Sequence, residues 1–179
     1  AHQDGKEEMN VSVVVPWVPS KPFNPICVEP GDELIVVDSN LPIFEARWKG
    51  IEQARHEWIV CADSDAVYPK DYIPKVKRAI LSGRYPYGFR TKRIGGFGHN
   101  FNVEASIVAR KDLLLEVCKN FRKLNYRDDF GRELKWLPLV EDITYYHGFT
   151  TGEKQSVAVA VSFALFGLAL MVPKTFVSH

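Results

Sequence analysis

The 179-residue sequence has few cysteines and almost no surplus of charge. Cys27, Cys61 and Cys118 are far apart, and no Cys-x-x-Cys pair occurs. An odd, scattered set argues against a disulfide framework or a structural zinc site and favours a reducing, cytoplasmic compartment. The 23 basic and 22 acidic residues give a formal net charge of +1. Because nucleic-acid-binding domains usually carry a basic surplus, we expect no nucleic-acid partner.

Other absences narrow the class further. The N-terminal stretch AHQDGKEEMN is polar and acidic, which is not typical of a secretory signal. The sequence contains no internal repeat and no phosphate-loop motif of the form G-x-x-x-x-G-K-[ST]. Hydrophobic residues nevertheless make up 46% of the chain and aromatic residues 12%. Length and composition together predict one globular domain with a substantial core.

Short apolar runs alternate with helical patterns along the first 120 residues. Strands are predicted at 10–16, 33–38, 57–62, 85–90 and 101–109, and helices at 44–55, 70–81 and 111–120. A further apolar stretch, 137–140, runs into Glu141 and Asp142. This alternation favours an α/β fold with a central, mainly parallel sheet flanked by helices. Ligands of such sheets bind at the carboxyl ends of the strands.

Carboxylates follow two of these predicted strands directly. Asp38 ends the strand at 33–38, and Asp63 and Asp65 follow the apolar run WIVCA. On extended backbone, two aspartates one residue apart share a face and repel each other unless a cation lies between them. Mg²⁺ and Mn²⁺ prefer such oxygen ligands. The alternative is that these residues only end a strand or cap the next helix.

Four segments, in this order, resemble the glycosyltransferases of family 2, which have the GT-A fold. They are VSVVVP, ELIVVDSN, EARWKGIEQARHEWIVCADSDAVYP and LPLVEDITYYH, and they span residues 11–147. The resemblance implies a single Rossmann-like GT-A domain, which we assign to residues 1–152. Residues 153–179 then form a separate hydrophobic C-terminal segment.

The resemblance also implies a nucleoside-diphosphate sugar donor and a divalent cation, Mn²⁺ or Mg²⁺. Asp38 would contact the base, and Arg47 would face the nucleotide. Asp63 would lie near the ribose, and Asp65 would hold the metal, with Asp63 as a second candidate ligand. The sequence departs from the family at three places. The segment between Asp38 and Arg47 is too short for the helix and strand that the family usually has there, and Trp48 stands where the family commonly has Asn. The chain also ends early, so that acceptor-binding elements are expected to be trimmed.

The later Glu141-Asp142 segment would supply the catalytic base. Asp142 would deprotonate an acceptor hydroxyl, and the resemblance implies inversion at the anomeric carbon. The acceptor itself, a glycan, a protein or a lipid-linked group, stays open. Two other classes of protein are alternatives to a glycosyltransferase. One is a sugar nucleotidyltransferase, and the other is an inactive nucleotide-sugar-binding or membrane-attached domain. A sugar nucleotidyltransferase normally has a Gly-Gly-x-Gly-Thr-Arg segment after its first strand, where this chain has Pro16-Trp17-Val18-Pro19.

Several further features have both a structural and a functional interpretation. His147 is either a metal ligand or an ordinary half-buried histidine, and Trp136 is either core or a stacking surface for an acceptor ring. A basic group around the glycine-rich turn either meets phosphate or is only solvated; it consists of Arg84, Arg90, Lys92, Arg93 and His99. The uncharged stretch 156–172 would reach only about 25 Å as a helix, against a hydrocarbon core of about 30 Å. It therefore either packs on the domain or makes a peripheral contact with the inner face of a membrane.

Overall fold

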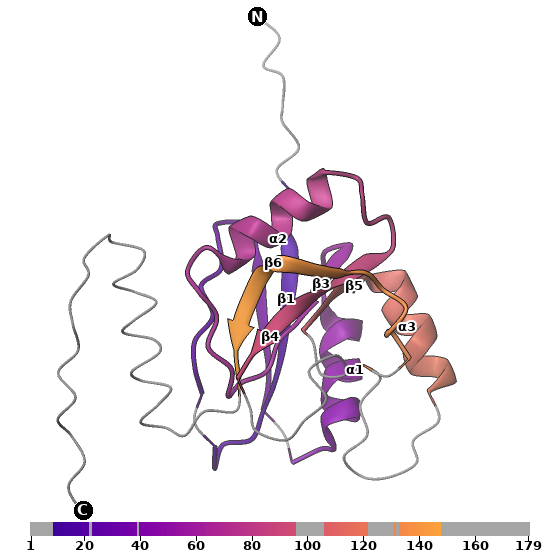
Figure 1. Cartoon of the computed structure of the whole chain (residues 1–179). Helices are drawn as coiled ribbons and strands as arrows, with labels where there is room; N and C mark the ends of the chain where they lie inside the picture. The colour runs from indigo at the N-terminus through magenta and orange to yellow at the C-terminus, as the bar shows by residue number, and fades with distance from the viewer. Residues whose placement is uncertain are drawn as a thin grey trace, which may run out of the picture.

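The structure, a computed structural model, describes residues 9–21, 23–38, 40–95, 106–121, 131 and 133–147. These ranges contain six strands and three helices (Figure 1). In chain order they are β1 Val11–Trp17, β2 Glu33–Asp38, α1 Ile43–Gln53, β3 Trp58–Cys61, α2 Tyr72–Leu81, β4 Gly88–Ile94, β5 Ile107–Arg110, α3 Lys111–Asn120 and β6 Leu139–Tyr146.

The six strands form one sheet in the order β2-β1-β3-β5-β4-β6. β1 pairs in parallel with β2 and β3, and β4 pairs in parallel with β6. β5 is antiparallel to both of its neighbours, β3 and β4. Five of the six strands therefore point the same way, which confirms the mainly parallel α/β sheet. Their carboxyl ends meet at one side of the sheet, called the carboxyl edge below.

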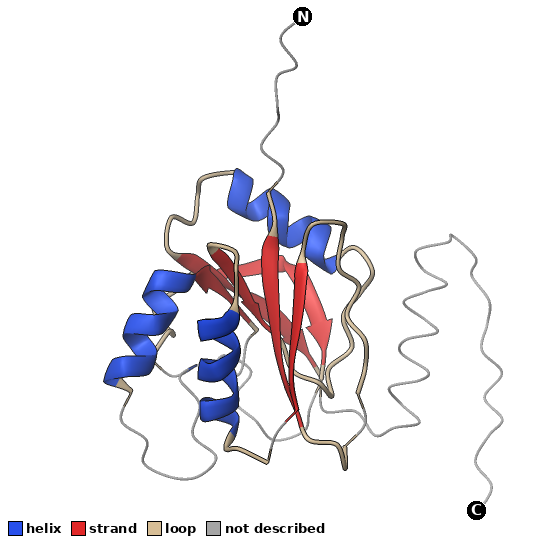
Figure 2. Cartoon of the chain, turned by 180° about the vertical axis from the view of Figure 1, so that it is seen from behind, coloured by secondary structure: helices blue, strands red, loops and turns tan. Residues whose placement is uncertain are grey.

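Two cores cover the two faces of the sheet. Val11, Val13 and Val15 of β1 face the cluster that contains α2, whereas Val14 faces the cluster formed with α1 and α3. Successive side chains of a strand point to opposite faces, so the run VSVVV can bury apolar groups on both sides. Figure 2 shows the result, with α1 and α3 side by side on one face and α2 on the other.

The predicted elements agree with the structure except at two strands and one turn. The three helices and the strand at 33–38 are confirmed, with ends moved by up to two residues. β4 extends to Ile94 and includes residues expected in a glycine-rich turn. β6 runs over eight residues where only a short apolar stretch was expected, because it pairs with β4. Residues 101–105 of the predicted strand 101–109 lie outside the described residues.

β2 forms one edge of the sheet. Only residues 39–42 connect it to α1, so no further strand is inserted next to it. Leu34 and Val36, on the face of β2 that registers with Val13 and Val15, are 39% and 38% exposed. The short segment noted in the sequence therefore has a direct structural consequence: among the described strands, β2 pairs only with β1, and it ends at Asp38.

Candidate active site

The Asp63-Ser64-Asp65 segment forms a turn at the carboxyl edge, directly after β3. The amide of Ala62 donates to the carbonyl of Val14, which ties the segment to β1, and the amide of Ala66 donates to the carbonyl of Asp63 at 3.4 Å. The backbone is thus not extended, and the expected shared face of the two aspartates does not form. Asp63 and Asp65 instead contact partners on two different elements.

The Asp63 carboxylate is held by Arg47, which belongs to α1. The guanidinium of Arg47 is buried, donates to the carbonyl of Ala62 at 3.1 Å and pairs with the Asp63 carboxylate. The amide of Asp63 donates to the hydroxyl of Tyr68 at 3.0 Å. A buried guanidinium stays charged and therefore requires such acceptors. Arg47 thus orients Asp63, and a direct role toward the nucleotide stays a prediction.

Asp65 faces His147, which follows the last residue of β6. His147 Nε2 lies 2.9 Å from Asp65 Oδ1, and the two side chains are 21% and 40% exposed. The backbone fixes this approach, because Val67 and Tyr146 exchange amide-to-carbonyl bonds of 2.7 and 2.9 Å. The buried Nδ1 of His147 has no hydrogen-bond partner among the described residues. The imidazole therefore has one ring nitrogen, Nδ1, without a described hydrogen-bond partner. The Asp65 carboxylate beside it is accessible to solvent.

A cluster of buried tyrosines lies beneath the turn. The rings of Tyr68 and Tyr145 stack at 5.3 Å, and Tyr72 meets Tyr68 edge-on at 4.8 Å. The hydroxyl of Tyr72 lies 2.9 Å from Thr91 Oγ1 and donates to Ser106 Oγ. Burial raises the pKa of Tyr72 to about 12 and also raises the pKa values of Tyr68 and Tyr145. The cluster is therefore an uncharged, rigid support for the aspartate turn at neutral pH.

The loop that contains Phe23 lies next to the aspartate turn. The amide of Asn24 donates to the carbonyl of Ser64 at 2.8 Å, which joins residues 18–27 to the turn. At the end of β1, the indole of Trp17 donates to the carbonyl of Lys21 and meets Phe23 edge-on. Asp38 is exposed and stands opposite Trp17 in the β1–β2 register. The carboxyl edge thus carries Asp38, Asp63 and Asp65, as the sequence predicted.

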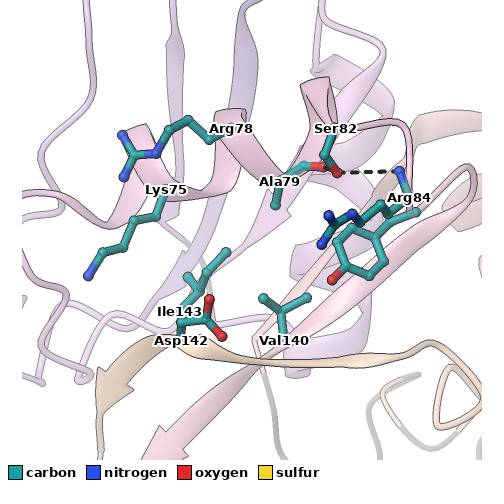
Figure 3. Close-up of a pocket in the computed structure, with 9 residues that line it drawn as sticks. Lys75, Arg78, Ala79, Ser82, Arg84, Val140, Asp142 and Ile143 are labelled. Atoms are coloured by element: carbon teal, nitrogen blue, oxygen red, sulfur yellow. Dashed lines mark hydrogen bonds between the residues drawn. The ribbon is translucent and has the colours of Figure 1, made fainter.

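Asp142 lies elsewhere, on a bulge in β6. Val140 pairs with Thr91 and Thr144 with Lys92, so the three residues between them oppose a single step of β4. Asp142 lies within this bulge, four positions before the end of β6 at Tyr146. Its exposed side chain lines a cavity against α2 (Figure 3). No described contact joins Asp142 directly to Asp63 or Asp65, so a common site for the three acids stays a prediction.

The basic group around the predicted turn is dispersed by the fold. Arg84 lines the cavity with Asp142, the Arg90 side chain donates to the carbonyl of Leu137, and Lys92 pairs with Glu141 at 3.0 Å. Arg93 is buried, and His99 lies outside the described residues. Trp136 does not belong to the core, since it is 58% exposed, and Tyr87 lies beside it. Its role as a stacking surface stays a prediction.

Sequence analysis missed two groups of residues. Tyr68 and Tyr145 were not singled out, since their contact joins distant segments and leaves no local signal. Lys75 and Arg78 had a signal, because their spacing of three places them on one face of α2, which Ser82 follows as the C-cap. Among the described residues, no three His, Cys, Asp or Glu side chains cluster as a metal site. Within the same residues, no helix has the length and hydropathy to cross a bilayer.

The mixed sheet with an acidic turn at its carboxyl edge defines an α/β protein of the nucleotide-binding kind. The sequence profile described as glycosyl transferase family 2 matches residues 29–158, more than two thirds of the chain. The chain therefore belongs to glycosyl transferase family 2. No curated protein matches the sequence significantly.

Solved structures agree on the fold, which is that of the GT-A glycosyltransferases. The fragment 1–349 of TarS from S. aureus in complex with UDP has a TM-score of 0.57 at 14% identity, covering 91% of this chain and 67% of that one. Another structure of TarS from S. aureus has a TM-score of 0.54 at 13% identity, and 91% of this chain corresponds to only 41% of that chain. A mycobacterial protein has a TM-score of 0.51 at 17% identity, with coverages of 89% and 75%.

Proposed function

We propose that this protein transfers a sugar from a nucleoside-diphosphate sugar to an acceptor hydroxyl, with a divalent cation and with inversion. The observation that carries the proposal is the aspartate turn in a family 2 chain, held at the carboxyl edge with Asp65 against His147. This edge is where α/β sheets bind their ligands. We also propose that the GT-A domain covers residues 1–152.

The donor nucleotide binds along the carboxyl edge between β2 and β3. The TarS fragment was solved with UDP and with UDP-GlcNAc, which supports a nucleoside-diphosphate sugar for this fold. Asp38 accepts hydrogen bonds from the base, and Trp17 and Phe23 form the neighbouring aromatic wall. Asp63 contacts the ribose, with its carboxylate oriented by Arg47.

The residues present suit a divalent cation beside the diphosphate. Asp63 is engaged by Arg47, whereas Asp65 is accessible and faces His147. The unpartnered Nδ1 shows that Asp65 alone does not satisfy the imidazole. A carboxylate with an imidazole suits Mn²⁺ better than Mg²⁺, which prefers oxygen alone. A bound cation would neutralise the charge that develops on the departing diphosphate.

Asp142 acts as the general base in this proposal. The acceptor oxygen attacks the anomeric carbon while the bond to the diphosphate oxygen breaks, and the hydroxyl proton passes to the Asp142 carboxylate. One displacement inverts the configuration at carbon. A carboxylate base contributes a rate factor of about 10²–10⁴. Its place on the α2 side of β6 implies that the acceptor approaches from that side.

A membrane contact through residues 156–172 completes the proposal. The segment is uncharged and lies outside the described residues. The family match reaches residue 158, so most of this stretch follows the matched domain. A membrane-side location would suit an acceptor attached to lipid, and it would keep the enzyme on the cytoplasmic face. No observation favours the nucleotidyltransferase or the inactive binding domain.

Thermal unfolding with UDP-, GDP- and TDP-sugars, each with and without Mn²⁺, tests the proposal. We expect one donor with Mn²⁺ to raise the melting temperature, because a ligand at 100 times its Kd stabilises the folded state by about 2.7 kcal/mol. Asp65→Asn should remove the Mn²⁺-dependent part of the rise. Asp112→Asn, which changes an exposed carboxylate on α3, should retain it. If no nucleotide sugar stabilises the protein in the presence of Mn²⁺, the proposed function is wrong.

A further inference from the structure

The cavity between α2 and β6 is a second chemically distinctive place in the structure. It has a volume of about 280 Å³ and is lined by Lys75 and Arg78 of α2, by Ser82 and Arg84 after the helix, and by Asp142. Figure 3 shows the basic side chains on the helix side and the Asp142 carboxylate on the strand side. Three cations and one carboxylate therefore share one small space.

The two arginines of this cavity have no ion-pair partner within the described part of the chain. Lys75 pairs with Asp71 at 2.8 Å. The guanidinium groups of Arg78 and Arg84, in contrast, make no hydrogen bond or ion pair with any residue that the structure describes. The Asp142 carboxylate has no such partner either. Counting Asp71 with the lining residues, the surroundings carry three positive and two negative charges.

Local structure sets the position of Arg84. The hydroxyl of Ser82 donates to the carbonyl of Ala79 at 2.7 Å and accepts from the amide of Arg84 at 3.3 Å. Gly83 between them adopts a φ of +68°, which turns the chain sharply after α2. The turn brings Arg84 back over the last turns of the helix, to the cavity that Arg78 also lines. Two arginines from different segments thus line the same cavity.

We propose that this cavity is the acceptor subsite and that it recognises an anionic acceptor. Arg78 and Arg84 bind a phosphate or carboxylate group of a hydroxylated compound, because guanidinium groups match the geometry of both anions. The neighbouring hydroxyl of the same compound then lies at Asp142. The substrate class is a polyol or sugar that carries a phosphate or carboxylate next to its free hydroxyl. The acceptor role rests on the proposed function of Asp142; the anion site itself does not.

Site-resolved NMR of the arginine Nε–Hε groups tests this inference with three probes: glycerol 3-phosphate, glycerate and uncharged glycerol. We expect one or both anions to shift the Arg78 and Arg84 signals saturably, and glycerol to leave them unchanged. The anion that binds more tightly, glycerol 3-phosphate or glycerate, identifies phosphate or carboxylate as the preferred group. The double variant Arg78→Gln, Arg84→Gln should weaken binding at least tenfold.

Arg55→Gln is the matched control, since Arg55 is also an exposed arginine but pairs with Glu33 near β2. It should change the affinity less than twofold. Anion affinities that are equal in wild type and double variant, or signals that no probe shifts, overturn the inference. If nucleotide sugars still stabilise the protein in that case, the proposed function stands. Anion binding without any nucleotide-sugar binding keeps the anion site and removes its acceptor role.

Discussion

At the scale of single residues, neighbouring carboxylates acquire different properties from their surroundings. Glu141 pairs with Lys92 on one side of β6, whereas Asp142 faces the α2 cavity without a described partner. Asp63 and Asp65 show the same divergence, because one is held by Arg47 and the other faces His147. Because the Asp142 carboxylate has no partner among the described residues, its oxygens are available for a substrate proton.

The pair at 141 and 142 supports a direct test of the catalytic base. Asp142→Asn should lower the rate of nucleoside-diphosphate release from the donor by about 10²–10⁴-fold, since it removes the proton acceptor. The donor-induced rise in melting temperature should persist, because the donor binds at the carboxyl edge. Glu141→Gln removes only an exposed ion pair, worth about 0–1 kcal/mol, and should change the rate less than threefold. Equal rate losses in the two variants would contradict the assignment.

At the scale of elements, each helix combines a core face with a second face that has its own task. Ile73, Val76 and Ile80 of α2 enter the core, while Lys75 and Arg78 line the cavity. α1 buries Phe44 and Ile51 and presents Arg47 to the aspartate turn. The packing of α1 on the sheet therefore positions Asp63.

Gly50 determines how closely α1 approaches β1 and β2. A Cβ atom at this position would overlap Val14 Cγ1 and lie 3.1 Å from Val37 Cγ2. Alanine is better than glycine in a helix by about 1 kcal/mol. Overpacking a core nevertheless costs about 1–3 kcal/mol, and the β-branched Val14 has little freedom to move.

Gly50→Ala should therefore destabilise the protein and shift the urea midpoint down. Lys49→Ala, one residue earlier on the exposed face of the same helix, should leave the midpoint nearly unchanged. A higher midpoint for Gly50→Ala would show that the helix can move away from the sheet at no cost. It would also remove close packing as the reason that Arg47 reaches Asp63.

At the scale of the whole molecule, the tyrosine cluster joins the segments that form the site. Tyr68 follows the aspartate turn, Tyr72 begins α2 and Tyr145 belongs to β6. Burial raises the pKa of Tyr72 from its ordinary value of 10.0 to about 12. The folded state thus favours the protonated hydroxyl more strongly than the unfolded state does.

This shift predicts a loss of stability at alkaline pH. The contribution of Tyr72 is fully present below pH 10 and decreases as the pH rises toward 12, by about 1 kcal/mol at pH 11. The free energy of unfolding, measured in urea at pH 8 and pH 11, should fall accordingly. Tyr72→Phe should show a smaller fall, because phenylalanine has no proton to lose. An equal fall in both proteins would contradict the role of Tyr72.

The sequence by itself determined the α/β class, the helix positions and the acidic residues at the carboxyl edge. These follow from hydrophobic periodicity and from residues next to strand ends, which are local properties of the chain. The tertiary structure decided the partners of those residues. Asp65 meets a histidine 82 positions away, Arg47 lies beneath Asp63, and a bulge in β6 directs Asp142 toward α2. Such contacts depend on strand pairing and helix packing between distant segments, and no local pattern encodes them.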